Sequence, residues 1–241
     1  MIDIIYLTYK INNLKYSLPA LKYLNYNFNL IIHNDNPEIE LTKEWLLENC
    51  ELDEIKYNTL TILNESENVG MLFSRINSFN SVENSEYTMF MDDDDYLLVR
   101  DLPEFDDHSW YRYNIVGVKA IDELTREEYN YTPRIHFGIT ASFWKSSLLK
   151  ETFKWIEHNP FKSKINMLED FTIQQISQAV AIKKGYKYLS HLNILGMVYT
   201  IYNTQEKYSH IKDPRYCKEK SDYVKELHTY IANLRLKILN S

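Results

Sequence analysis

Residues 87–95 read Tyr-Thr-Met-Phe-Met-Asp-Asp-Asp-Asp, an apolar run that stops abruptly in four aspartates. The apolar part, residues 87–91, has the length and the continuous hydrophobicity of a buried strand. In an open α/β sheet, ligands bind in the crevice beyond the carboxyl ends of the strands. The aspartates after this strand therefore stand where such a sheet places its binding site.

The residues before this stretch alternate between strand-like and helix-like segments. Apolar runs predict strands at 4–8, 28–33 and 60–63. After each strand, apolar residues at helical spacing predict a helix, at 14–24, 42–50 and 69–82 respectively. Strands that are apolar throughout, rather than alternating, indicate a mostly parallel sheet with helices on both faces. The predicted fold class is therefore α/β, of Rossmann-like type.

The second half of the chain has a weaker pattern. Residues 97–134 mix polar segments with a candidate strand at 115–118, which we interpret as irregular or antiparallel structure. Helical spacing returns at 146–157, 167–184 and 218–239. Because the 241 residues contain no Pro/Gly-rich linker, we expect a single domain over residues 1–210 and a C-terminal helix over residues 211–241.

Composition narrows the class of protein. A net charge of -7 disfavours duplex nucleic acid as a bulk partner, because such binding relies on neutralising phosphates. Cys50 and Cys217 are too few and too far apart for a zinc site or a disulfide framework, which favours reduced thiols in the cytoplasm. No leader precedes the first strand, and no apolar run approaches the ~20 residues that span a bilayer. We expect a cytoplasmic protein without a transmembrane segment.

The C-terminal helix has an apolar stripe flanked by basic residues. Docking onto its own domain is the commonest use of such a stripe. Peripheral attachment to a membrane surface and pairing with a second copy, as in a homodimer, are the alternatives.

The four aspartates repel one another. In a partly buried crevice they resist ionising together unless a cation or strong donors offset the charge. Mg²⁺ and Mn²⁺ prefer hard oxygen ligands of this kind. A solvated loop, or the N-cap of a following helix, is the structural alternative, since aspartate is favoured in both places.

Five blocks of sequence, in order along the chain, resemble the inverting glycosyltransferases of the large family with the GT-A fold. The blocks are Leu7-Thr8-Tyr9-Lys10 after the first strand, residues 31–37 after the second, Asn68-Val69-Gly70 with Ser74-Arg75-Ile76-Asn77 at a helix start, residues 87–95 with an Asp-x-Asp motif, and Leu168-Glu169-Asp170-Phe171. The resemblance covers roughly residues 1–203. It implies a metal-dependent enzyme that moves a sugar from a nucleotide diphosphate, with a UDP-sugar as the expected donor. The acceptor would be a hydroxyl of a glycan, a lipid carrier, a protein or a modified nucleobase.

The resemblance also implies roles for single residues on the nucleotide side. Thr8 and Tyr9 would hold the base, with the Tyr9 ring stacked on it. Asp35 would accept a hydrogen bond from uracil. Arg75 would contact the nucleotide or its phosphates, for which a planar guanidinium is suited. Asp92 matches the first aspartate of the motif, near the ribose.

On the reacting side, Asp94 matches the aspartate that coordinates Mn²⁺ or Mg²⁺ between the two phosphates, a task that Asp92 is expected to share. Asp93 fills the variable middle position, and Asp93 and Asp95 are candidates for contacts with the sugar, Asp95 also for the metal. Asp170 matches the general base that takes the proton from the acceptor hydroxyl. Glu169 is a further candidate for the sugar site.

Some positions depart from the family pattern. Asn34 and Pro37 stand where relatives carry an acidic residue and Ser, which weakens the assignment of the nucleotide. The family's Tyr-Arg-x-His segment is missing, so His191 and His210 are candidates for a substitute metal ligand. Trp144 is a candidate platform for a sugar, with a packed core residue as the alternative.

Two other functions stay open. A nucleotidyltransferase of similar topology also uses paired acidic residues and a metal. It would be expected to carry a Gly-rich phosphate loop after the first strand, and residues 8–12 contain no Gly. The other is a non-catalytic nucleotide-binding relative, against which the presence of both Asp94 and Asp170 argues.

Overall fold

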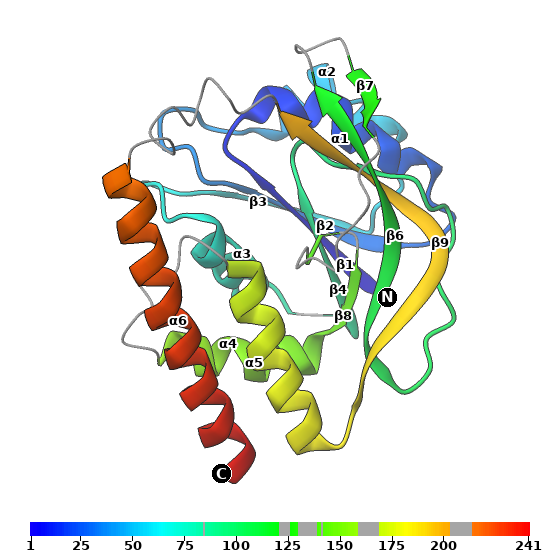
Figure 1. The fold of residues 1–241 in the computed structure, drawn as a ribbon. Helices are drawn as coiled ribbons and strands as arrows, with labels where there is room; N and C mark the ends of the chain where they lie inside the picture. The colour runs from blue at the N-terminus through cyan, green and yellow to red at the C-terminus, as the bar shows by residue number, and fades with distance from the viewer. Residues whose placement is uncertain (84, 121–125, 130–138, 141, 159–168, 203–213) are drawn as a thin grey trace.

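One mixed sheet runs through the protein, with helices on both faces (Figure 1). The computed structural model describes residues 1–83, 85–120, 126–129, 139–140, 142–158, 169–202 and 214–241. Among these residues the strand order is β3-β2-β1-β4-β8-β6-β9-β5, with β7 paired to β6 outside this path. The α/β class and the mostly parallel central sheet that the sequence predicted are confirmed.

The first four strands are parallel neighbours. They are β1 (Ile2–Thr8), β2 (Phe28–Asn34), β3 (Thr59–Asn64) and β4 (Tyr87–Asp92). Each begins and ends within two residues of its predicted bounds. The apolar runs were a sufficient signal because these strands supply both faces of the sheet with core residues.

The remaining strands extend the sheet beyond β4. They are β5 (Tyr96–Leu97), β6 (His108–Ala120), β7 (Arg126–Tyr129), β8 (Ser142–Lys145) and β9 (Lys187–Tyr202). β8 pairs antiparallel with both β4 and β6, whereas β6 and β9 are parallel to each other. The candidate strand at 115–118 is thus part of a longer strand with parallel as well as antiparallel partners.

The helices divide between the two faces of the sheet. One face carries the short helices η1 (Ile11–Asn13), α1 (Leu14–Ser17), η2 (Leu18–Tyr23), α2 (Lys43–Asn49) and η3 (Leu52–Glu54). The other face carries the longer helices α3 (Met71–Asn80), α4 (Ser146–Glu157), α5 (Glu169–Lys184) and α6 (Pro214–Asn240). In β1, Ile4 and Tyr6 join the first core while Ile5 and Leu7 join the second. This alternation explains why the strand is apolar at every position.

Two predicted helices differ from the observed ones for local reasons. The helix expected at 14–24 is a single α-helical turn followed by the 3₁₀ helix η2, near whose start Pro19 lies. Proline lacks the N–H that a continuing α-helix requires. The helix expected at 69–82 begins only after Gly70, whose φ of 79° is a left-handed conformation that favours glycine.

The C-terminal helix α6 packs against its own domain. Leu227, Ile231 and Ile238 lie in the core that α6 shares with α5, and the Arg235 guanidinium donates to the side chains of Gln175 and Gln178. These contacts bury apolar residues of α6 within the domain. Within the described part of the chain, no helix has both the length and the apolar character needed to cross a bilayer.

Candidate functional site

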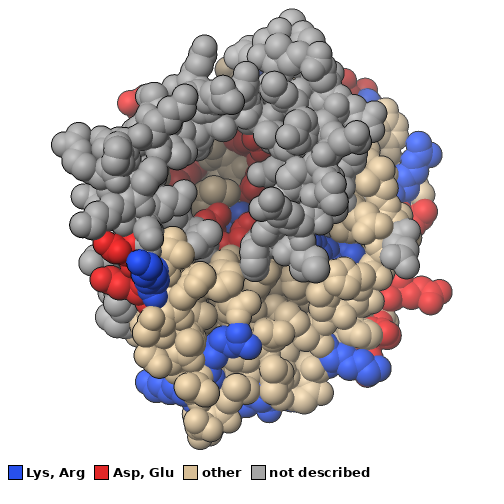
Figure 2. All heavy atoms as spheres, viewed as in Figure 1, with Lys and Arg blue, Asp and Glu red and all other residues tan. Residues whose placement is uncertain are grey.

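Polar residues end the four parallel strands at one edge of the sheet. In the strand register Thr8 lies beside Asn34, Asn34 lies beside Asn64, and Leu7 lies beside Asp92. The carboxyl ends of these strands therefore meet, which is where α/β sheets bind their ligands. Figure 2 shows a hollow in this view of the molecule, with acidic side chains and a basic side chain inside it.

Asp93 is tied to the loop that follows β1. Its carboxylate accepts hydrogen bonds from the Thr8 hydroxyl at 2.6 Å, the Asn13 side-chain amide at 3.0 Å, and the backbone N–H groups of Tyr9 and Lys10 at 3.2 Å. Burial raises the pKa of Asp93, although these donors oppose the shift. The structure thus shows Asp93 holding this loop through both of its oxygens, and its contact with the sugar stays a prediction.

The loop that Asp93 holds also presents Tyr9. The Tyr9 side chain is 49% exposed, so its ring is accessible to a base. Thr8, in contrast, is buried, and its hydroxyl proton is used on Asp93. The structure thus gives Thr8 a supporting role, while stacking by Tyr9 stays a prediction.

Asp95 lies inside the protein. It is 0% exposed, and its charge helps burial to raise the pKa of Tyr6, a core residue of β1. Its carboxyl group is buried in this structure, and the contact of Asp95 with the sugar or the metal stays a prediction. Asp92 and Asp94 are half-buried. They are the first and third aspartates of the run, which match the two aspartates of an Asp-x-Asp motif, and both are partly exposed.

Arg75 joins two of the candidate site residues. Its Nη1 lies 3.2 Å from Oδ1 of Asp92, and its Nη2 lies 3.4 Å from Oδ1 of Asp170. Asp92 ends β4 and Asp170 lies in the first turn of α5, so the arginine on α3 links three elements. Arg75 is fully buried, and this arrangement gives its guanidinium two carboxylate partners. Its contact with the nucleotide stays a prediction.

Burial and like charge act on the acidic residues at the start of α5. Burial raises the pKa of Asp170 to about 8, with Glu169 and Asp92 adding to the shift and Arg75 opposing it. Burial likewise raises the pKa of Glu169, again against the effect of Arg75. Burial lowers the pKa of Arg75, but the three carboxylates outweigh it and the net shift is upward. One guanidinium thus faces three carboxyl groups, an excess of negative charge that favours a bound cation.

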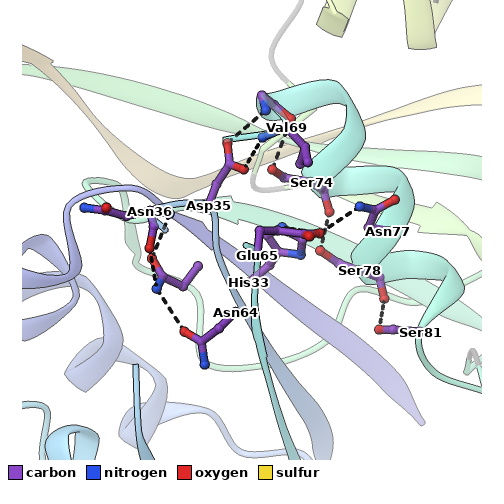
Figure 3. Close-up of polar contacts among 12 residues, drawn as sticks. His33, Asp35, Asn36, Asn64, Glu65, Val69, Ser74, Asn77, Ser78 and Ser81 are labelled. Carbon is purple, nitrogen blue, oxygen red and sulfur yellow. Dashed lines mark hydrogen bonds and ion pairs between the residues drawn. The ribbon is translucent and has the colours of Figure 1, made fainter. Parts of the chain in front are cut away.

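Asp35, directly after β2, forms hydrogen bonds to the start of α3. Its two carboxylate oxygens accept from the backbone N–H groups of Val69 at 2.7 Å and Gly70 at 2.9 Å, just before α3 begins (Figure 3). Carboxylates are favoured at a helix N-terminus because they satisfy free N–H groups and complement the helix dipole. The sequence did not predict this role. The contact with uracil stays a prediction.

Further polar residues, which the sequence analysis did not single out, lie at the carboxyl end of β2. His33 is fully buried, with its Nε2 3.4 Å from Oε1 of Glu65, and burial lowers the pKa of His33 (Figure 3). The Asn34 amide donates to the Asn64 side chain at 2.9 Å. The available signal was the position of His33 and Asn34 at the end of an apolar run, directly before Asp35.

Trp144 belongs to the core. It is 0% exposed, its ring stacks on Trp110 with the centroids 4.4 Å apart, and its Nε1 donates to the Ser142 hydroxyl at 2.9 Å. The sequence offered Trp144 either as a sugar platform or as a packed core residue, and its burial agrees with packing. The strand order explains why Trp144 is buried, since its strand β8 lies between β4 and β6.

His191, the histidine candidate within the described residues, does not join the aspartates. His191 is exposed on β9, opposite Arg112 of β6, and forms no group with two further metal-ligating side chains among the described residues. His210 lies outside the described residues. Asp92 and Asp94 also form no preformed group of three ligands there. That pattern suits Mg²⁺ and related ions, which are often held by one or two carboxylates together with substrate phosphates and water.

Asp106, Asp107 and His108 form a separate group, with ligand atoms within 4.8 Å of one another. They precede or begin β6, at the edge opposite the carboxyl end of β4, because β6 runs in the same direction as β4. Asp107 pairs with Lys187 at 2.8 Å, and Asp106 accepts from the Tyr111 hydroxyl at 2.7 Å. These contacts already compensate the charge of this surface group.

Comparison by sequence finds no matching family model and no matching curated protein. Several solved structures share the fold. S. aureus TarS matches over 83% of this chain with a TM-score of 0.56 and 14% identity. A shorter form of TarS in complex with UDP matches over 83% with a TM-score of 0.54 and 15% identity. Mannosyltransferase PcManGT from Pyrobaculum calidifontis, in complex with GDP-Man and Mn²⁺, matches over 82% with a TM-score of 0.54 and 12% identity.

This chain spans 36% of the length of TarS, 61% of the shorter TarS form and 56% of the mannosyltransferase chain. At these identities the match establishes the fold alone, which this chain shares with TarS and with the mannosyltransferase. The resemblance seen in the sequence is confirmed at this level.

The pKa of Asp170 generates a prediction about stability. Its folded pKa of about 8 lies above the ordinary value, so between about pH 4 and about pH 8 the folded state keeps a proton that the unfolded chain has released. This group therefore makes the free energy of unfolding fall as pH rises through that range. Asp170→Asn removes the titration, so its stability relative to wild type should increase with pH. Urea unfolding in the presence of a chelator measures this, and a difference that stays constant with pH would contradict the assignment.

Proposed function

We propose that this protein is a metal-dependent inverting glycosyltransferase that moves a sugar from a nucleotide diphosphate, expected to be UDP, to an acceptor hydroxyl. One observation supports the proposal most: Arg75 brings Asp92, at the end of β4, together with Asp170, at the start of α5. Solved proteins of this fold include complexes with UDP, with UDP-GlcNAc, and with GDP-Man and Mn²⁺. The proposal extends that chemistry to the corresponding edge of this sheet.

Asp92 and Asp94 would hold the cation. Both are half-buried oxygen donors at the carboxyl end of β4, and the excess of carboxylates over guanidinium groups favours a positive ion there. Bound between these residues and the diphosphate, Mn²⁺ or Mg²⁺ would offset the negative charge that develops on the leaving group. Tyr9, on the loop held by Asp93, would stack on the base, and its exposed ring supports this role.

Asp170 would act as the general base. The acceptor oxygen forms a bond to the anomeric carbon while the bond from that carbon to the phosphate oxygen breaks, and the electron pair leaves with the nucleotide diphosphate. The hydroxyl proton passes to the Asp170 carboxylate. A pKa of about 8 suits this task, because a base is most effective when its pKa lies near the working pH. Attack from the face opposite the leaving group inverts the anomeric centre.

The acceptor would be a glycan, a lipid carrier, a protein or a modified nucleobase, and all four stay predictions. A cytoplasmic or peripheral membrane location and a homodimer also stay predictions. The nucleotidyltransferase alternative differs in its products, since it would release pyrophosphate rather than a nucleoside diphosphate.

The donor site is tested by thermal unfolding with UDP. A ligand that binds only the folded state raises the melting midpoint by mass action, so UDP with Mn²⁺ should raise it more than UDP alone. Asp94→Ala should abolish the part of the increase that depends on Mn²⁺. Asp106→Ala is the matched control, because it removes a carboxylate from the other acidic group, and it should keep the full increase. The reverse result, with Asp106→Ala losing the increase and Asp94→Ala keeping it, would contradict the proposed site.

The base is tested by Asp170→Asn. Loss of a general base costs about 10²–10⁴-fold in rate, so turnover should fall by at least about 100-fold. Affinity for UDP, measured by calorimetry with Mn²⁺, should stay within about twofold, since Asp170 touches the acceptor rather than the nucleotide. A parallel loss of UDP affinity would instead assign Asp170 to the donor site.

A further inference from the structure

Arg75 is wholly buried although it is charged. Its side chain is 0% exposed, on the inner face of α3. Charged residues are almost never fully buried unless they are paired, because leaving water costs several kcal/mol per ion. The position of Arg75 therefore depends on its two carboxylate partners, Asp92 and Asp170.

The guanidinium group is fixed on several sides. Its two Nη atoms reach carboxylates on two different elements, and its central carbon lies 5.7 Å from the centroid of the Phe90 ring on β4. Its Nε is buried and has no hydrogen-bond partner in the described structure. No donor atom of Arg75 is thus accessible to a ligand in the hollow.

The two carboxylates belong to different parts of the proposed reaction. Asp92 lies on the donor side, and Asp170 is the proposed base on the acceptor side. The planar fork of an arginine directs two N–H groups at the two carboxylates from fixed positions, whereas a lysine offers one ammonium on a flexible stem and holds two partners less rigidly. The link is non-local, since Arg75 is 17 residues from Asp92 and 95 residues from Asp170 in the sequence.

We propose that Arg75 is a positioning residue: it fixes the base Asp170 relative to the donor-side Asp92 and touches neither the nucleotide nor the sugar. This inference rests on the proposed transferase function. It differs from the role that the sequence resemblance implied, in which the same arginine contacts the nucleotide. A group that only positions the base affects turnover and leaves donor affinity unchanged.

The test compares Arg75→Lys with wild type in kcat, in KM for the sugar nucleotide, and in the dissociation constant of UDP with Mn²⁺. Misplacing a reacting group by about 1 Å costs on the order of 100-fold, so kcat should fall by about 10- to 100-fold. The dissociation constant of UDP should stay within about twofold. Arg112→Lys is the matched control, because Arg112 is a buried arginine on β6, and it should leave kcat unchanged.

A second variant covers the case in which Arg75→Lys does not fold. Arg75→Met combined with Asp170→Asn removes the buried cation together with one buried carboxylate, which limits the charge left unpaired. This double variant should bind UDP with Mn²⁺ as wild type does, again within about twofold.

Two results would overturn the inference. One is a rise in the UDP dissociation constant of Arg75→Lys, or of the double variant, by the same factor as the loss in kcat/KM. The other is an unchanged kcat in a folded Arg75→Lys protein. Both results are defined by comparison with a wild-type protein that is active. They are therefore distinct from a failure of the proposed function, in which the wild-type protein itself turns over no sugar nucleotide.

Discussion

A buried guanidinium between two carboxylates holds the candidate site together. Arg75 on α3 contacts Asp92 on β4 and Asp170 on α5, and each of the three would be unfavourable in its position without the others. The geometry of the crevice therefore depends on the packing of α3 and α5 on one face of the sheet. The core that buries Phe90 and Ile76 on that face is also what keeps water away from Arg75.

The same interaction explains why the site should attract a cation. Arg75 supplies one positive charge against Asp92, Glu169 and Asp170, and burial makes each uncompensated carboxylate costly. A protonated Asp170 relieves part of this cost in the free protein. A divalent ion carried with a diphosphate is the other way to relieve it, and it leaves Asp170 free to accept a proton.

Much of the fold was predictable because its signals are local. Continuous apolar runs located β1, β2, β3 and β4, and the polar residues at their ends located the binding edge. The sequence could not show which of the four adjacent aspartates are buried against other parts of the chain and which are partly exposed. Asp93 and Asp95 differ from Asp92 and Asp94 only through partners such as Thr8 and Tyr6, more than 80 residues away.

The contacts of Arg75 and Trp144 were not predictable from the sequence for the same physical reason. Nothing adjacent in the sequence distinguishes an arginine that meets a phosphate from one that meets Asp170, 95 residues later. Trp144 is buried because β8 inserts between β4 and β6, and this strand order is a tertiary property. Contacts between residues far apart in the sequence thus determine what these two side chains do, and local sequence patterns do not reveal such contacts.

The most direct test of the central claim is the location of manganese in a crystal grown with UDP and Mn²⁺, found from its anomalous scattering. The account predicts a peak at the carboxyl end of β4, about 2–2.5 Å from a carboxylate oxygen of Asp94 and in contact with the diphosphate. A manganese ion found only at Asp106, Asp107 and His108, with UDP bound elsewhere or not at all, would contradict it.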